Sequence, residues 1–90
     1  MSDFRINEQN RQFELDVEGQ KAIITYSKKE GAIALNHTEV PESLQGKGIA
    51  NKIVSQALNY IKENGFKVIP NCSFVAAYIQ RHPEWKSLVK

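Results

Sequence analysis

Three side chains in this sequence have types that could move protons or carry a covalent intermediate. Cys72 is the only cysteine, and a thiolate is a strong nucleophile. His37 and Glu39 are two residues apart, so in a strand they share one face, where either could accept a proton. Structural roles are equally open at this point, since a lone cysteine is often a small buried hydrophobe and the other two can be solvated strand residues.

A second chemical signal is the segment Gln45-Gly46-Lys47-Gly48-Ile49-Ala50, which precedes a strong helical pattern. The first amides of a helix have no intrahelical partner, and the helix dipole adds positive potential there. Glycines at positions 46 and 48 would let a ligand approach the backbone. The segment therefore favours a phosphate or pyrophosphate group, with Lys47 as a further contact, although two glycines can also make a simple tight turn.

The elements that must position these residues follow from hydrophobic periodicity. Alternating or β-branched runs predict three strands near residues 12–18, 22–27 and 32–40, joined by short turns as an antiparallel meander. Apolar residues at three- and four-residue spacing predict a helix from Ile49 to about Glu63, closed by Asn64-Gly65. A short strand at 66–69 and a helix at 73–81 follow, each stopped by a proline, whereas residues 1–10 are expected to be a loose lead-in.

The resulting order is β-β-β-α-β-α, an α+β fold. The unit from 32 to 69 is expected to be a right-handed crossover whose two strands run parallel. Ninety residues make a single domain, 1–90, and a hydrophobic content of 41% is ordinary for a globular fold.

Composition argues against several classes of function. A net charge of +2, with scattered basic residues, does not favour a general nucleic-acid binder. One cysteine cannot form an internal disulfide, and there is no apolar run of membrane-spanning length and no secretory signal. Two histidines and one cysteine, widely spaced, do not form a metal-ligand pattern. We therefore expect a cytoplasmic protein, a monomer, with no metal, no membrane contact and no nucleic-acid partner.

The segment 45–50 matches the Gln/Arg-x-x-Gly-x-Gly/Ala signature of the GNAT superfamily of acyl-CoA-dependent N-acetyltransferases. From Ala32 to Trp85 the chain resembles this family, and His37-Thr38-Glu39-Val40-Pro41 and Pro70-Asn71-Cys72-Ser73-Phe74-Val75 resemble its very small members. The resemblance implies a minimal GNAT-like fold. It also implies that acetyl-CoA is the cosubstrate and that an amine, of unknown identity, is the acceptor.

The resemblance further implies a role for each candidate residue. Coenzyme A would bind through its pyrophosphate to the loop, and its pantetheine would lie in a V between strands 32–40 and 66–69. The implied cofactor-binding residues are Asn36, Thr38, Val40, Gln45, Gly46, Lys47, Gly48, Ile49, Ala50 and Asn71. The implied catalytic residues are Cys72, as acyl carrier or proton donor, His37 or Glu39 as base, and Tyr78 as general acid. Tyr78 matches the family's Asn-x6-Tyr spacing from Asn71, although it also fits an apolar helix stripe.

Larger family members carry one strand and two helices before the meander, which help to wall the acceptor pocket, so here we expect that side to be open. The leading prediction is an acetyl-CoA-dependent N-acetyltransferase. The alternative is a module that binds CoA or acyl-CoA with little or no turnover, and a protein-interaction domain ranks last.

Overall fold

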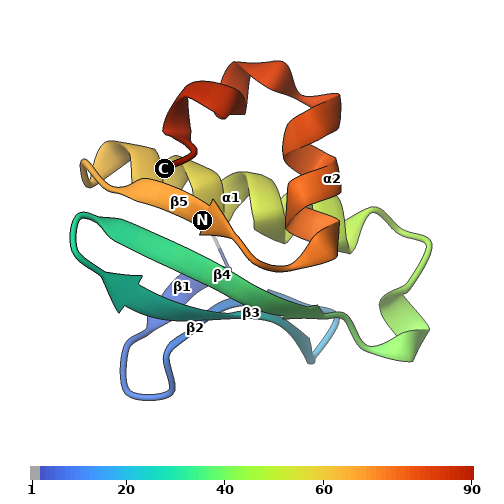
Figure 1. Ribbon diagram of the computed structural model, residues 1–90. Helices are drawn as coiled ribbons and strands as arrows, with labels where there is room; N and C mark the ends of the chain where they lie inside the picture. The colour runs from blue at the N-terminus through green and yellow to red at the C-terminus, as the bar shows by residue number, and fades with distance from the viewer. Residues whose placement is uncertain (1–2) are drawn as a thin grey trace.

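The computed structural model describes residues 3–90, which form a five-stranded sheet with both α-helices on one of its faces (Figure 1). The strand order is β1-β2-β3-β4-β5; the first four are antiparallel neighbours, and β5 runs parallel to β4. The elements are β1 Phe4–Asn7, β2 Gln12–Val17, β3 Gln20–Lys29, β4 Ala32–Glu39, η1 Glu42–Leu44, α1 Ile49–Glu63, β5 Lys67–Pro70, α2 Ser73–Arg81 and η2 Pro83–Leu88.

The predicted α+β fold, with its meander followed by a β-α-β unit and a C-terminal helix, is confirmed. The prediction for residues 1–10 was wrong where it can be compared, because residues 4–7 form β1, which pairs with β2. Residues 1 and 2 lie outside the described part of the chain. A strand of four residues is too short for its alternation to stand out in the sequence, so only its pairing with β2 reveals it.

The core lies between the sheet and the two helices. Phe13 is fully buried, and its ring lies 5.1 Å from that of Tyr26, 5.5 Å from that of Tyr60 and 5.8 Å from that of Phe4, between ring centroids. The apolar stripe of α1 faces this cluster through Ile49, Ile53, Val54, Ala57, Leu58 and Ile61. The predicted helical stripe therefore attaches α1 to the sheet and fixes the position of the glycine loop before it.

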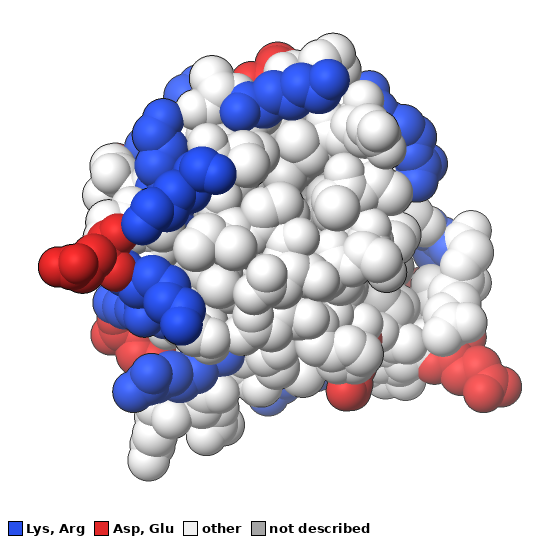
Figure 2. Space-filling model, in the orientation of Figure 1, with Lys and Arg blue, Asp and Glu red and all other residues white. Residues whose placement is uncertain are grey.

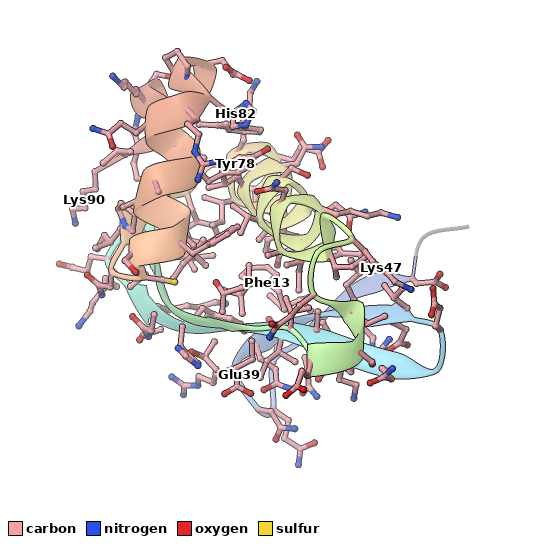
Figure 3. The ribbon with its side chains drawn as sticks, turned by 90° about the vertical axis from the view of Figure 1, so that its right-hand side faces the viewer. Phe13, Glu39, Lys47, Tyr78, His82 and Lys90 are labelled. Carbon is pink, nitrogen blue, oxygen red and sulfur yellow. The ribbon has the colours of Figure 1, made fainter. Side chains whose placement is uncertain are left out.

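The other face of the sheet carries neither α1 nor α2 (Figure 3). It holds a buried carboxylate, that of Glu14. Glu14 is only 1% exposed, yet four neighbouring side chains satisfy it. Gln12 Nε2 and Asn7 Nδ2 donate to its Oε2 at 2.6 and 3.0 Å, while Arg5 Nε and Lys21 Nζ lie 2.9 and 3.5 Å from its Oε1. We call this side of the sheet the open face; Glu14 joins β1, β2 and β3 across it.

The carboxylates on the open face should make the protein less stable in acid. Burial would raise the pKa of Glu14, but hydrogen bonds from Gln12 and Asn7 and the nearby cations lower it overall; a hydrogen bond from Arg5 lowers the pKa of Asp16. Because both pKa values are lower in the folded protein, their stabilisation is present above the unfolded-state values and is lost as pH falls through the folded ones. Urea unfolding between pH 6 and pH 3 should show a steeper loss for wild type than for Glu14→Gln. Equal losses would contradict a role for Glu14.

One irregularity in the sheet decides where the side chains of β4 point. The ladder to β3 pairs Tyr26 with Leu35 and Thr25 with His37, so Asn36 is an extra residue, a β-bulge. Tyr26 belongs to the core, so Thr25 and its partner His37 face the open side. Thr38, the next residue along β4, faces the helices.

Candidate functional site

Strand β4 continues past the end of β5. Their pairing ends at Leu35 and Pro70, after which the chain turns at Asn71 and Cys72 into α2. Residues 37–39 of β4 therefore pair with β3 on one side only, and their other backbone edge faces the space between β4 and α2. The family resemblance implied a V between two splayed strands; here β5 is paired over its whole length and the space opens only beyond its end, and we keep the name V for this space.

Several predicted site residues meet across this V. The backbone N–H of Cys72 donates to the carbonyl of Leu35 at 2.9 Å, and Cys72 Sγ lies 3.4 Å from Thr38 Oγ1. Asn71 Nδ2 donates to Asn36 Oδ1 at 3.0 Å, and the Asn36 amide donates in turn to Ser27 Oγ at 2.7 Å. The contacts place the single thiol beside the unpaired edge of β4.

The surroundings of the Cys72 thiol lower its pKa. Burial would raise its pKa, but hydrogen bonds from the Thr38 hydroxyl and from the backbone N–H groups of Val75, Phe74 and Thr38 outweigh burial, so the pKa is lower than usual. Val75 and Phe74 are in the first turn of α2, whose unpaired amides favour a negative charge. Cys72 is therefore a better acid and a better source of thiolate than an ordinary cysteine.

This ionisation can be measured directly, because the chain has only one cysteine. The rate of alkylation by iodoacetamide should rise with pH to a midpoint below the ordinary value for a cysteine thiol. Thr38→Val keeps the shape of the side chain but removes its hydroxyl, so the midpoint should rise. Thr25→Val, on the open face, serves as the matched control. An unchanged midpoint in Thr38→Val would show that the hydroxyl does not stabilise the thiolate.

The loop before α1 presents a row of unpaired backbone donors. In residues 3–90 the six consecutive amides 46–51 have no backbone or side-chain acceptor, and Gly48, the N-cap of α1, adds no side-chain cap. The first bond of the helix runs from Lys52 N–H to the carbonyl of Gly48 at 3.1 Å. Both Gly46 and Gly48 have left-handed backbone conformations, with φ of 82° and 74°. This arrangement suits an anion.

A hollow of about 220 Å³ lies against these amides. A Cβ atom added at Gly46 or Gly48 would meet nothing within 4 Å, so the space beside both glycines is open. The lining comes from the loop, the first turn of α1 and one residue of α2: Val40, Leu44, Gln45, Gly46, Gly48, Ile49, Ala50, Asn51 and Phe74. The hollow is thus large enough for part of a ligand, and both glycines are among its lining residues.

Two polar residues of the loop have partners within the protein. The side-chain amide of Gln45 donates to the carbonyl of Val40 at 3.3 Å, which links the loop to the end of β4. The ammonium of Lys47 lies 3.3 Å from a carboxylate oxygen of Glu18 in the β2–β3 turn, and both side chains are exposed. On the face shown in Figure 2, most of the Lys and Arg side chains lie on the side of the β3–β4 turn, and others lie over the C-terminal helices. The positive potential at the loop therefore depends chiefly on its amides.

A second hollow, of about 380 Å³, lies on the open face beside the same strand end. His37 Nε2 lies 3.2 Å from Glu39 Oε2, and both side chains are more than 60% exposed. Figure 3 shows Glu39 on the side of the sheet away from the helices. The lining consists of Lys21, His37, Thr38, Glu39, Val40, Pro41 and Gln45. Val40 and Gln45 line both hollows, so the two adjoin, and Lys21 is a lining residue that sequence reasoning missed.

Tyr78 lies apart from these contacts. It is 8% exposed and belongs to the core, and its ring centroid is 4.3 Å from that of His82. Figure 3 shows Tyr78 and His82 on the side of α2 that faces α1. The structure thus brings Asn36, Thr38, Asn71 and Cys72 together, and His37 with Glu39. Tyr78 has no hydrogen bond to any of them within residues 3–90.

No helix within residues 3–90 is long and apolar enough to cross a membrane. In the same part of the chain, no three His, Cys, Asp or Glu side chains are grouped so that they could hold a metal ion.

Comparison with known proteins gives consistent similarities. The profile of a family described as GCN5-related N-acetyl-transferase matches residues 12–88. Protein NATD1 of Mus musculus is 32% identical over 78 residues, which cover 83% of this chain and 71% of that protein. Protein NATD1 of Homo sapiens is 32% identical over 76 residues, covering 81% and 67%. The solution structure of a GCN5-like candidate N-acetyltransferase from Staphylococcus aureus superimposes with a TM-score of 0.73 and 27% identity, over 100% of this chain and 91% of that one.

Proposed function

The chain belongs to the GCN5-related N-acetyltransferase family, and we propose that it transfers the acetyl group of acetyl-CoA to an amine. The family implies a donor and an acceptor, and two adjoining hollows are available for them. The proposal assigns the donor to the hollow beside the glycine loop and the acceptor to the hollow on the open face. The acetyl group would pass between them at the V.

The observation that carries the proposal is the row of six unpaired amides at 46–51. Such a row lacks partners for its donors, and the pyrophosphate of coenzyme A would supply acceptor oxygens for them. The open backbone edge of residues 37–39 offers further groups to the amides of pantetheine. The donor would be held by Asn36 and Thr38 on β4, Val40 just after it, Asn71 after β5, and Gln45 to Ala50 on the loop.

The side chains around the V can supply the proton transfers. The amine must be neutral to attack, and His37, in contact with Glu39, is the group we assign to accept its proton. The nitrogen forms a bond to the thioester carbon, the carbon–sulfur bond breaks, and the thiolate of CoA departs. Cys72 is the group we assign to give a proton to that thiolate, because it lies in the V and its pKa is lowered. The second proton, which the nitrogen loses as the amide forms, then restores the Cys72 thiol. Tyr78 is a weaker candidate, since its ring packs against His82.

Calorimetric titration of acetyl-CoA and of CoA, followed by an assay of CoA release with a panel of amines, tests the proposal. Saturable binding with amine-dependent CoA release would support it. Binding without release would favour the alternative, a module that binds CoA or acyl-CoA without turnover. No binding at millimolar ligand would overturn both. Intact mass after incubation with acetyl-CoA alone would reveal an acetyl group on Cys72, which would replace direct transfer by a covalent intermediate.

A further inference from the structure

The hollow on the open face is lined by charges of both signs, which bears on the kind of amine it receives. Glu39 contributes a carboxylate, and Lys21, from β3, contributes an ammonium group. We propose that the acceptor is a small amine that also carries a carboxylate, an amino acid in the broad sense. Its ammonium end would be received at Glu39 and His37, and its carboxylate at Lys21. This inference rests on the proposed transferase function.

The ammonium group of Lys21 has hydrogen-bond donors that its contact with Glu14 does not use. Its Nζ lies 3.5 Å from Glu14 Oε1, the longest of the four polar contacts of that carboxylate. Arg5 and the amides of Asn7 and Gln12 already satisfy Glu14 at 3.0 Å or less. A lysine ammonium has three hydrogen-bond donors. Because Lys21 is 46% exposed, it can keep its contact to Glu14 and still donate to a ligand.

The carboxylate of Glu39 is equally available to a ligand. Its only ion-pair partner within residues 3–90 is His37, which carries a positive charge only when protonated. With a neutral imidazole the carboxylate is left without a cation, and it attracts an incoming ammonium ion. The same imidazole can then accept the proton that the amine must lose before it attacks. Glu39 therefore binds the form of the amine that predominates in water, and His37 converts it to the reactive form.

The sheet register sets the separation of the two charges. Ile23 is the cross-strand partner of Glu39, and Lys21 precedes Ile23 by two residues on the same face. Such diagonal neighbours are about 7–8 Å apart between Cα atoms. A short molecule with an amine at one end and a carboxylate at the other can contact both side chains. A simple alkylamine would leave Lys21 without a ligand contact, and a diamine would be repelled by it.

The size of the hollow favours a small molecule over a protein segment. Its volume of about 380 Å³ lies at the lower end of the range for small-molecule sites. All of its lining comes from β3, β4 and the residues that follow β4. The ligand would be held at its two ends on one sheet surface.

The test compares acceptors that differ only in the carboxylate: 4-aminobutyrate and butylamine, assayed by CoA release at fixed acetyl-CoA. Wild type should favour 4-aminobutyrate in kcat/KM by about tenfold, the scale of one hydrogen bond to a charged group. Lys21→Gln should bring the ratio close to one, and Lys21→Arg should preserve most of it. Lys29→Gln, the same change at an exposed position of the same strand, is the matched control and should leave the ratio unchanged.

A reversal of charge makes the test stricter. Lys21→Glu should turn the preference toward 1,4-diaminobutane, provided that urea unfolding shows the variant to be folded. A wild-type ratio near one, or a ratio that Lys21→Gln does not alter, would overturn the carboxylate proposal while leaving the transferase function intact. Binding of acetyl-CoA without turnover of any acceptor would overturn both proposals.

Discussion

Replacing Gly48 by tryptophan should abolish measurable binding of acetyl-CoA and of CoA. We expect affinity to fall by about 100-fold or more, which corresponds to about 2.7 kcal/mol of binding free energy. A Cβ atom at this position meets no protein atom within 4 Å, so the new side chain would occupy the space beside the amides 46–51. Calorimetric titration of the variant and wild type under the same conditions measures the effect.

The control for this prediction is a glycine that has the same left-handed backbone conformation but lies elsewhere in the fold. Gly65 has φ of 75° against 74° for Gly48, and its Cβ would also meet open space. Gly65→Trp therefore carries the same left-handed penalty, of the order of 1–2 kcal/mol. Both variants should lose similar stability in urea, but only Gly48→Trp should lose the ligand. Equal affinity in the two variants would remove the glycine loop from the binding site.

The largest effect on stability is expected from Phe13→Ala, at about 3–5 kcal/mol. The Phe13 ring is fully buried; it stacks on Phe4, is tilted against Tyr26 and contacts Tyr60 in an edge arrangement, so the change leaves a cavity bounded by three other aromatic rings. Figure 3 shows Phe13 between the sheet and the helices. A domain of this size is often stable by only about 5–15 kcal/mol, so a large part of that margin would be lost.

Urea unfolding at pH 7 measures this effect, and Ile23→Ala gives a control. Ile23 is the same kind of apolar strand residue, but it is half-buried on the open face. Its truncation should cost clearly less than that of Phe13. If the two variants lost equal stability, the helix-covered side of the sheet would not contain the main core.

The fold could be predicted largely from local patterns. The stripe from Ile49 to Ile61 and the alternation in β2 each repeat several times, so one exception does not hide them. β1 has only four residues and depends on pairing with a strand that follows it, which a local pattern does not report. The glycine loop could also be predicted from the sequence. The unpaired amides belong to the start of the helix that follows, and the need for glycine arises from the same helix start.

The rest of the candidate site depends on the register in which the strands pair, which single residues do not specify. Alternation with Ala22 places Lys21 on the open face, but only the pairing of Ile23 with Glu39 brings it to the acceptor hollow. The contacts of Cys72 with Thr38 and of Asn71 with Asn36 likewise depend on where β5 stops. The roles assigned to these residues stay predictions until the variants are measured.

The bulge at Asn36 has a consequence for how this chain can change over generations. Because Asn36 is the extra residue, its deletion would leave Leu35 opposite Tyr26 and His37 opposite Thr25, a regular ladder with the same residues on each face. His37 and Glu39 would stay on the open face and Thr38 would stay beside Cys72, while the contacts of the Asn36 amide with Ser27 and Asn71 would be lost. We therefore expect a deletion at Asn36 to be tolerated more readily than a deletion elsewhere in β4, because the bulge already holds one residue that the ladder does not pair.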